Sequence, residues 1–409
     1  MKKCLVIVKN IFVNDARVNR ACCTLVQKGL SVQVIAEKSS KGLPIYEVDG
    51  YSVIRVPVFS SLYSRRYSNR TSQVFSQNRR NLISSVLGII KKNKARKNIV
   101  SELNSICFNV QTVILGILFR PDVIIANDLE TLTAGFVLKK IMRCKLIYDS
   151  HEIWLEGNTF HSASIFKQKY WKYLESILIS KVDHVSVTTN YRAHYLKCKY
   201  NLSSIQVIRN CPSFRQIDKR KIFHDEYHLP KNVKVVLYQG LIDRQRGVFT
   251  MVDVVSEISD VVLILLGRGQ DKNSLQEYIE EMRMSNKVFI KDEVPHSILL
   301  DYTAAADVGL QLLKNTGINH YSTISNKIFE YFLAEIAILG SDFPEIKKII
   351  QENKIGLVVD PSDTNNIKKQ LTLLLQDSKL NEIRDNYKRI SNKYSWKLEE
   401  YKLVEIVET

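Results

Sequence analysis

Short apolar runs alternate with helical stretches along both halves of the chain, and this alternation constrains the fold more than any other feature. Cys4–Val8, then Asp15–Lys28, then Ser31–Ala36 set a strand, helix and strand pattern that repeats to about residue 209. Continuous apolar strands separated by helices are typical of a parallel sheet covered on both faces. The pattern therefore predicts an α/β fold.

The same pattern starts again after a polar stretch that runs from Asn210 to Pro230, with Lys234–Gly240 as its first strand. A chain of 409 residues is long for a single core. We expect residues 1–212 and 213–390 to form two Rossmann-like domains that face a cleft. Residues 391–409 are expected to form a C-terminal helix that packs back toward the first domain.

The net charge of +17 is concentrated in one interval. Eleven basic residues and no acidic residue lie between Asp49 and Glu102. Such a run binds an anionic surface, which can be phospholipid, a lipid pyrophosphate or nucleic acid. We interpret residues 61–97 as a basic insertion that docks on an anionic membrane, and a solvated surface remains the alternative.

The cysteines and the lengths of the apolar runs indicate in which cellular compartment the protein is expected. No pair of the seven cysteines has the C-x-x-C spacing of a zinc or redox site, which favours a reducing cytosol and buried thiols. The apolar run in Cys4–Val8 is too short for a signal peptide, and Val110–Phe119 is well short of the roughly 18 residues of a spanning helix. We expect a cytoplasmic protein that does not span the membrane.

Polar side chains follow the predicted strands of the first half. Asp15 begins the first helix, Asp128 follows one strand, and His151 follows the next. Ligands bind at the carboxyl edge of such sheets, so these residues are candidates for orienting an acceptor hydroxyl. An ordinary helix cap at Asp15 and a structural histidine remain the alternatives.

The second half carries a basic turn and a carboxylate at the corresponding edge. Arg246 and Gly247 open a helix, where a guanidinium and backbone amides can bind a diphosphate. Gly267 ends the next strand. Glu330 lies early in a later helix, where a carboxylate suits the hydroxyls of a ribose, and a surface glutamate that caps the helix is the alternative.

Several segments resemble the family-four retaining glycosyltransferases, which have the GT-B fold. These segments are Asp15–Val18, Tyr148–Glu152, Gln239–Gly247, Gly267–Gly269, Lys291–Pro295, Asn326–Tyr331 and Ser341–Glu345. The resemblance implies that Glu330 binds the donor ribose and shares a catalytic role with His151. It also implies donor contacts from Arg246, Gly247, Gly267 and Lys327, and acceptor contacts from Asp15, Asp128 and His151.

Four positions depart from that family, including Glu335 and Ala337, which stand where a glycine and a proline are usual. Leu241 stands where an arginine is usual, and Arg244 is expected to replace the lost phosphate contact. Ser322 stands where the first of two glutamates, close to the transferred sugar, is usual. The sugar pocket of this chain is therefore expected to differ from that of its relatives.

We expect a glycosyltransferase that uses a UDP- or GDP-linked sugar, acts with retention on a glycan or lipid-linked acceptor, and serves bacterial surface-polysaccharide synthesis at the inner membrane face. No cofactor and no metal are expected, because no D-x-D pair is present to hold one. A nucleotide-sugar epimerase of the same fold is one alternative. A non-catalytic protein that binds nucleic acid or membranes is the other.

Overall fold

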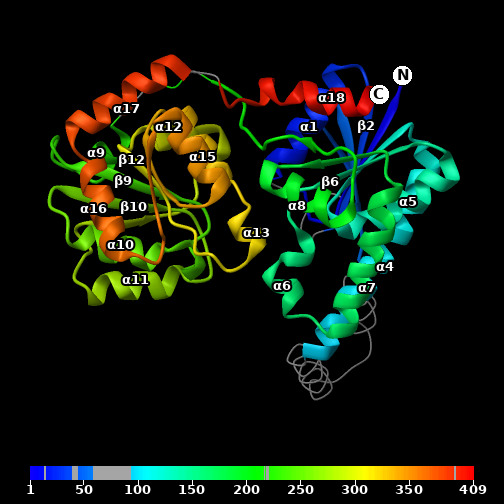
Figure 1. The fold of residues 1–409 in the computed structure, drawn as a ribbon, viewed down its shortest axis with the longest axis horizontal. Coiled ribbons are helices and arrows are strands. Elements are labelled where there is room, and N and C mark those ends of the chain that lie inside the picture. The colour runs from blue at the N-terminus through cyan, green and yellow to red at the C-terminus, as the bar shows by residue number, and fades with distance from the viewer. Residues whose placement is uncertain (13–14, 39–44, 59–93, 216, 218–220, 391–392) are drawn as a thin grey trace, which may run out of the picture. The chain divides into compact units, whose positions relative to one another are not determined.

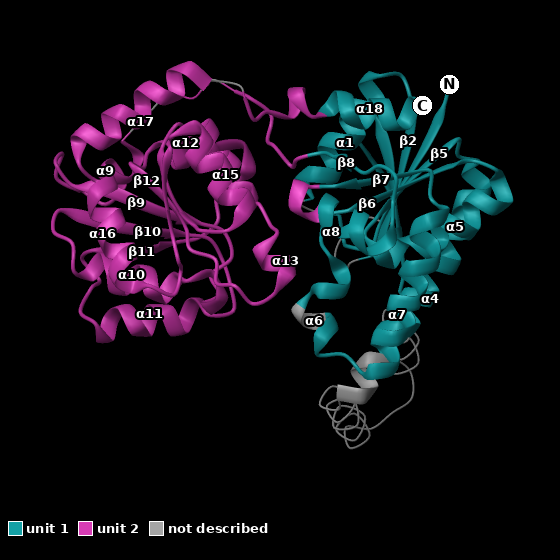
Figure 2. Ribbon diagram, in the orientation of Figure 1, with its two compact units in different colours: residues 1–187, 193–208, 400–409 teal, residues 188–192, 209–399 magenta. Residues whose placement is uncertain are grey.

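The computed structural model describes residues 1–12, 15–38, 45–58, 94–215, 217, 221–390 and 393–409. The chain forms two compact units (Figures 1 and 2). Unit 1 comprises residues 1–187, 193–208 and 400–409, and unit 2 comprises residues 188–192 and 209–399. The alternation of strands and helices predicted from the sequence is present in both units.

Unit 1 is built on an eight-stranded sheet in the order β3-β4-β2-β1-β5-β6-β7-β8. Its strands are β1 (Lys3–Val8), β2 (Ser31–Glu37), β3 (Ile45–Val48), β4 (Tyr51–Val56), β5 (Val123–Asn127), β6 (Lys145–Ser150), β7 (His184–Val187) and β8 (Gln206–Val207). All neighbouring pairs are parallel except β3 with β4. The sequence did not predict β3, which is an antiparallel edge strand with no buried residue.

The helices of unit 1 cover both faces of this sheet (Figure 1). They are α1 (Ala16–Gln27), α4 (Lys94–Phe119), α5 (Leu129–Met142), α6 (Asn158–His161), α7 (Ile165–Leu178), α8 (Asn190–Tyr200) and α18 (Glu400–Glu408), with 3-10 turns at Trp154–Glu156 and Ile179–Lys181. The division between the units falls inside α8, because Thr188–Arg192 groups with unit 2.

Unit 2 contains a fully parallel six-stranded sheet in the order β11-β10-β9-β12-β13-β14. Its strands are β9 (Lys234–Gln239), β10 (Val261–Leu266), β11 (Val288–Lys291), β12 (Val308–Gln311), β13 (Ala337–Ser341) and β14 (Gly356–Val359). The interior strand β10 is buried at every residue, as expected for a strand covered on both faces.

Helices pack on both faces of the second sheet as well. They are α9 (Ile222–Glu226), α10 (Val248–Ser256), α11 (Lys272–Glu281), α12 (His296–Ala304), α13 (Ile318–Tyr321), α14 (Asn326–Leu333), α15 (Pro344–Asn353), α16 (Thr364–Leu374) and α17 (Asp377–Ile390), with 3-10 turns at Arg244–Arg246 and Trp396–Leu398. Each unit therefore has its own core, formed by the apolar faces of its own sheet and helices.

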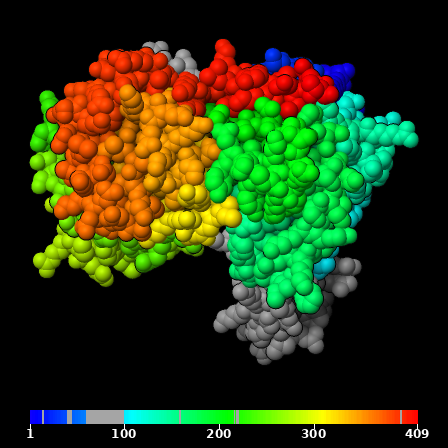
Figure 3. Space-filling view, viewed as in Figure 1, coloured from blue at the N-terminus to red at the C-terminus, as the bar shows by residue number. Residues whose placement is uncertain are grey.

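The end of the chain returns to unit 1. Helix α18 packs against α1, and Lys2 Nζ donates a hydrogen bond of 2.7 Å to the carbonyl oxygen of Val407. In the space-filling view the red C-terminal segment adjoins the blue N-terminal residues (Figure 3). The final helix thus packs on α1 and contacts the residue that precedes β1.

The predicted basic insertion at 61–97 lies almost wholly outside the described residues. Its last four positions, 94–97, form the start of α4. From the sequence, only Val110–Phe119 was recognised as an apolar segment. In the structure these residues are the end of α4, a single helix of 26 residues. By length and composition, Val100–Phe119 is long and apolar enough to cross a membrane, and it is the one such helix in the described part of the chain.

Candidate functional site

The three acceptor-site residues predicted in unit 1 lie at one edge of its sheet. Asp15 follows β1, Asp128 follows β5 and His151 follows β6, and these strands are neighbours in the order β1-β5-β6. Because all three strands are parallel, their carboxyl ends meet at the same edge. The topology therefore gathers residues that are far apart in the sequence.

His151 is buried at this edge and is held by several hydrogen bonds. Its backbone N–H donates to Asp128 Oδ1 at 3.0 Å. Its ring Nε2 lies 2.7 Å from Asp149 Oδ2 and 3.2 Å from Asn127 Oδ1. Since both neighbours of Nε2 are oxygen acceptors, we assign the proton to this nitrogen. The imidazole is thus fixed in orientation by a carboxylate.

Asp15 has a structural role and a charged neighbour. Its carboxylate caps α1 by accepting from the Val18 N–H at 3.3 Å, and it also accepts from Asn10 Nδ2 at 2.8 Å. Arg17 Nε lies 3.4 Å from Asp15 Oδ1. The helix cap that the sequence left as an alternative is therefore present, and it places Arg17 at the edge as well.

Electrostatics couple these groups. Burial raises the pKa of Asp128. For Asp149, burial acts in the same direction, but the charge and hydrogen bond of His151, the hydrogen bond from Ser186 and the charge of Arg17 together outweigh it and lower the pKa. The pKa of Arg17 is raised although burial opposes this, because its charge is stabilised by Asp15, Asp128 and Asp149. The edge is therefore rich in carboxylates, which are acceptors for sugar hydroxyls.

In unit 2, the predicted donor-site residues follow β9, β10 and β12, which are also neighbours. Arg246 and Gly247 lie between β9 and α10, Gly267 follows β10, and Glu330 lies on α14 after β12. The sheet order changes direction between β9 and β12, and crevices at such points bind ligands.

Two glycines shape this edge. Gly247 caps α10 with φ of +74°, and a Cβ there would lie 2.5 Å from the carbonyl oxygen of Leu312. At Gly267, with φ of +155°, a Cβ would lie 1.9 Å from the carbonyl oxygen of Gly240. Neither position tolerates a side chain. Both glycines are therefore required by close backbone contacts within unit 2, and Gly247 leads into α10, where the first amide groups favour a phosphate.

Lys327 is buried beneath this edge with its ammonium close to other charged groups. Its Nζ lies 4.4 Å from the centre of the Tyr238 ring. Burial, together with the positive charge of Arg246, lowers its pKa to about 7, and Glu330 opposes this shift. Arg246 and Lys327 are thus near enough to repel each other, and an anion between them would relieve that repulsion.

Glu330 is half-buried and anchored by the sheet. Gln239 Nε2, at the end of β9, donates to Glu330 Oε2 at 2.5 Å. Gln239 Oε1 in turn accepts from Thr303 Oγ1 at 2.8 Å. The carboxylate is therefore part of an ordered network at the sheet edge rather than a solvated helix cap.

Arg244 is placed differently from Arg246. Its guanidinium carbon lies 4.0 Å from the centre of the Phe249 ring, and its backbone N–H donates to Asp271 Oδ2 at 2.9 Å. The side chain is exposed. The predicted compensation for Leu241 by Arg244 therefore stays a prediction, and Arg246 is the arginine whose charge acts on Lys327.

Ser322, which stands in place of the usual glutamate, is fully buried in unit 2. Its hydroxyl accepts from Arg192 Nε at 3.3 Å and donates to the carbonyl oxygen of Asn319 at 3.3 Å. Arg192 also donates to Thr188 Oγ1 at 2.8 Å. A guanidinium therefore lies where the sequence departs from the family pattern.

Several residues of both edges were missed among the predicted site residues. In unit 1 they are Arg17 and Asn127, and in unit 2 they are Gln239 and Tyr238. A signal existed for one of them. Gln239 is a polar residue that ends an otherwise apolar strand.

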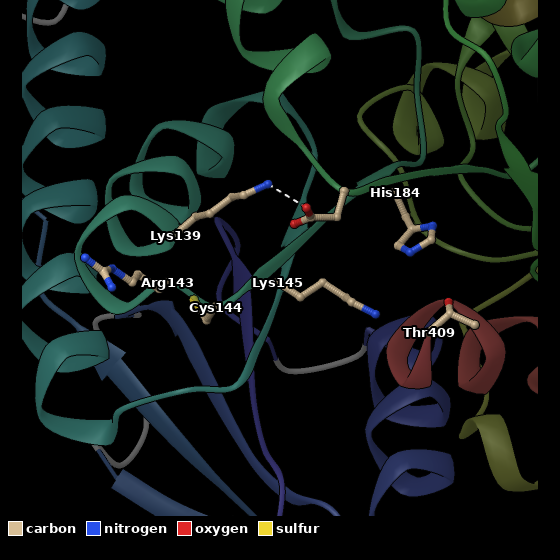
Figure 4. A pocket seen from close by; sticks show the side chains of 7 residues that line it. Lys139, Arg143, Cys144, Lys145, His184 and Thr409 are labelled. Atoms are coloured by element: carbon tan, nitrogen blue, oxygen red, sulfur yellow. Dashed lines mark hydrogen bonds and ion pairs between the residues drawn. The ribbon is translucent and has the colours of Figure 1, made fainter.

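A hollow of about 440 Å³ lies at the opposite edge of the unit 1 sheet. It is lined by Lys139, Arg143, Cys144, Lys145, Asp183, His184 and Thr409 (Figure 4). Lys145 and His184 begin β6 and β7, whereas His151 follows the other end of β6. This basic hollow is therefore separate from the candidate site.

Neither the cysteines nor a metal-binding cluster forms part of the candidate site in the described residues. All seven cysteines are free, and Cys198 is exposed, so the expectation that the thiols are buried is wrong for that residue. Within the described residues, no group of three His, Cys, Asp or Glu side chains is arranged as a metal site. Whether the chemistry proceeds without a metal stays a prediction.

Comparisons with known proteins match each half of the chain to a glycosyltransferase domain. Residues 15–211 match the family "Glycosyl transferase 4-like domain", and residues 219–391 match "Glycosyl transferases group 1". A chitobiosyldiphosphodolichol beta-mannosyltransferase from Candida albicans is 23% identical over 219 residues, which cover 48% of this chain and 46% of that protein. The chain thus spans about half the length of this curated relative.

Solved structures resemble the whole chain. Sucrose-phosphate synthase from Thermosynechococcus elongatus has a TM-score of 0.74 at 15% identity and covers 100% of this chain and 98% of its own. HepE from Anabaena, solved with UDP and glucose, has a TM-score of 0.70 at 14% identity, with 100% of both chains covered. At these identities the likeness concerns the fold, which confirms the predicted architecture. The chain therefore consists of two glycosyltransferase domains and has the GT-B fold.

Proposed function

We propose that this protein transfers a sugar from a nucleotide-sugar donor to a hydroxyl group of a glycan or lipid-linked acceptor. The observation that carries the proposal is the unit 2 edge. There, the Glu330 carboxylate is fixed by Gln239, and the buried Lys327 lies in the field of Arg246. A carboxylate beside paired cations matches the ribose and the diphosphate of one ligand.

In this proposal the diphosphate lies between Arg246, the start of α10 and Lys327, and the ribose hydroxyls donate to Glu330. Fixed cations and amides stabilise the diphosphate as negative charge develops on it during departure. A UDP-linked sugar is the first candidate, because the neighbour HepE was solved with UDP and with UDP-glucose. A GDP-linked sugar is the second.

Unit 1 would bind the acceptor. The Asp149 carboxylate orients His151, and the adjacent Asp128 adds a second acceptor for hydroxyl protons. Oriented hydrogen bonds of this kind position the attacking hydroxyl and supply part of the catalysis. Neither role requires a group that the chain lacks.

The finer parts of the proposal rest on the resemblance of the Asn326–Tyr331 and Tyr148–Glu152 segments to retaining enzymes. They are retention at the anomeric carbon, a role in bacterial surface-polysaccharide synthesis, and a cytoplasmic location at the inner membrane face. The matched mannosyltransferase from Candida albicans, named for a dolichol-linked acceptor, supports a lipid-linked acceptor here.

A nucleotide panel tests the donor half. Thermal unfolding of the purified protein is measured with UDP, GDP, ADP and CMP at equal concentrations, and one of the diphosphates is expected to raise the midpoint. The Arg246→Ala variant should lose most of that increase, whereas Arg244→Ala, which removes an exposed side chain stacked on Phe249, should lose a smaller part of it. No increase with any of the four nucleotides would contradict the proposed donor site.

Product analysis tests the reaction itself. The preferred nucleotide sugar is incubated with and without a hydroxyl acceptor, and the products are identified by NMR. Transfer predicts a new glycosidic bond, formed only with the acceptor, whose anomeric configuration matches the donor. A changed sugar in the absence of acceptor would instead identify an epimerase.

A further inference from the structure

Helix α4 presents aliphatic side chains outward, while its inward face combines the buried Phe108 with small and polar side chains. Its exposed face carries an aliphatic stripe at helical spacing, made of Leu103, Ile106, Val110, Ile114, Ile117 and Leu118. Leu118 is 75% exposed and Ile106 is 59% exposed. No charged residue occurs from Leu103 to Phe119. A helix whose outer face meets water normally has charged and polar residues there.

The inward face contains small and polar residues beside Phe108. Ser105, Thr112 and Gly116 are buried against unit 1. The Ser105 and Thr112 hydroxyls have no hydrogen-bond partner among the described residues. A Cβ on Gly116 would lie 2.5 Å from Leu138 on α5, so the two helices are in close contact. Small residues toward the protein and aliphatic residues outward are the pattern of a helix that contacts lipid.

Helix α7 extends this surface with aromatic side chains. Phe166 is 86% exposed, and Tyr170, Tyr173 and Ile177 are exposed at helical spacing, while Trp171 packs inward. Lys167 Nζ pairs with Glu102 Oε1 at 2.6 Å, which joins the starts of α7 and α4. The blue-green segment that carries α7 lies at the surface in Figure 3. We call the exposed side chains of α4 and α7 together the apolar face.

The charge beside the apolar face is positive. Helix α7 carries Lys167, Lys169 and Lys172, and its single acid, Glu175, is buried and accepts a hydrogen bond from Tyr148. Lys169 and Lys172 are exposed. Aliphatic and aromatic side chains interleaved with lysines match the boundary between the head groups and acyl chains of an anionic bilayer.

We propose that the apolar face docks on an anionic lipid bilayer, with α4 and α7 along its surface. A spanning arrangement does not fit, because Phe108 and the inward residues of α4 pack on the sheet of unit 1. A second copy of the chain is a poorer occupant, because it would bring the same lysines into apposition. This goes beyond the proposed transfer reaction, and it does not depend on the predicted role of residues 61–97.

A four-site variant tests the apolar face. Ile106, Ile114, Phe166 and Tyr170 are each replaced by Ser, and a control variant carries Ser at Ile45, Met282, Leu373 and Leu398, which are exposed apolar residues elsewhere. Flotation with phosphatidylcholine vesicles containing 30% phosphatidylglycerol should show at least tenfold weaker binding for the first variant and little change for the control. Both should keep the wild-type circular dichroism and the nucleotide-induced thermal shift.

Two further variants separate the contributions of the lysines of α7 and of the basic interval to vesicle binding. Lys169→Gln with Lys172→Gln should weaken binding to anionic vesicles by roughly thirtyfold, because each basic residue near such a surface contributes about 1 kcal/mol. A variant with Gln at Arg79, Arg80, Lys91, Lys92 and Lys94 measures how much the basic interval contributes to vesicle binding, for comparison with the apolar face. If only this last variant loses vesicle binding, or if the four-site variant instead converts a dimer to a monomer with vesicle binding unchanged, the proposal is overturned.

Discussion

The two units present the same edge of similar parallel sheets but surround it with opposite charge. In unit 1, Asp15, Asp128 and Asp149 gather near one guanidinium and one imidazole. In unit 2, Arg246 and Lys327 lie close enough that burial and mutual repulsion bring the pKa of Lys327 to about 7. The fold provides the position of each site, and the residues at the ends of the strands decide which ligand it accepts.

In the proposed function, this difference divides the reaction between the units. A carboxylate-rich edge accepts hydrogen bonds from hydroxyl groups, whereas a cation-rich edge with a glycine-capped helix accepts phosphate. The comparison predicts that variants of unit 1 change turnover and leave nucleotide binding intact. Variants of unit 2 should change nucleotide binding first.

The largest effect is expected at His151. His151→Ala should reduce the turnover number by a factor of about 10² to 10⁴, the usual contribution of a positioned acid–base side chain. The dissociation constant for the nucleoside diphosphate, measured by titration calorimetry, should not change. Asp149→Asn, which keeps the shape but weakens the orientation of the ring, should give a smaller loss. Wild-type turnover in His151→Ala would remove this residue from the reaction.

The next effect concerns Arg246. Arg246→Ala should weaken binding of the nucleoside diphosphate by more than tenfold, because charge-assisted hydrogen bonds to phosphate contribute roughly 1.5–3 kcal/mol. Arg244→Ala is the matched control, since its guanidinium stacks on Phe249, and it should cost less than threefold. Equal losses in both variants would mean that the two arginines share the site.

A moderate effect is expected at Glu330. Glu330→Gln keeps the size of the side chain but weakens its hydrogen bonds with the ribose, so donor affinity should fall roughly fivefold to tenfold. The thermal midpoint without nucleotide should change by only a few degrees. A variant that melts much earlier yet binds nucleotide normally would show that the carboxylate acts only in the Gln239 network.

The smallest expected effect is the uptake of a proton by Lys327 when the nucleoside diphosphate binds. Because the pKa of Lys327 is about 7 in the folded protein, the amine is mostly neutral at pH 8. A bound diphosphate raises that pKa, so binding at pH 8 should take up close to one proton, and less at pH 6. Calorimetry in buffers of different ionisation enthalpy measures this uptake. Lys327→Met should fold and should lose the uptake, and unchanged uptake would exclude contact with phosphate.

The lowered pKa of Lys327 also predicts how the stability of the protein without ligand depends on pH. The pKa of Lys327 is 10.5 when unperturbed, so between about pH 7 and that value the unfolded chain holds a proton that the folded protein releases. The free energy of unfolding should therefore gain from this group as pH rises through that window. The gain should be absent in Lys327→Met.

Much of the fold could be predicted because buried parallel strands are continuous apolar runs. Val261–Leu266 and Val123–Asn127 are examples that needed no tertiary information. The edge strand Ile45–Val48 could not be predicted, because it is short and pairs on one side only. The extent of α4 was missed because its apolar residues face outward, which reverses the usual relation between pattern and burial.

The sites were partly predictable for a related reason. The carboxyl-edge rule finds Asp128, His151 and Arg246, since the first two directly follow strands and Arg246 lies in the turn that leads from β9 into α10. It cannot tell that Gln239 anchors Glu330 or that Lys327 is buried beneath Tyr238, because those contacts join β9 to α14 across about 90 residues of sequence.

Hydrogen–deuterium exchange with a saturating nucleoside diphosphate tests the division of roles most directly. The account predicts protection in the peptides that cover 239–248, 266–269 and 326–331 of unit 2, with no change in 127–130 and 149–152 of unit 1. Protection confined to the unit 1 peptides, in a sample whose thermal midpoint the same nucleotide raises, would contradict the assignment of the donor to the cation-rich edge.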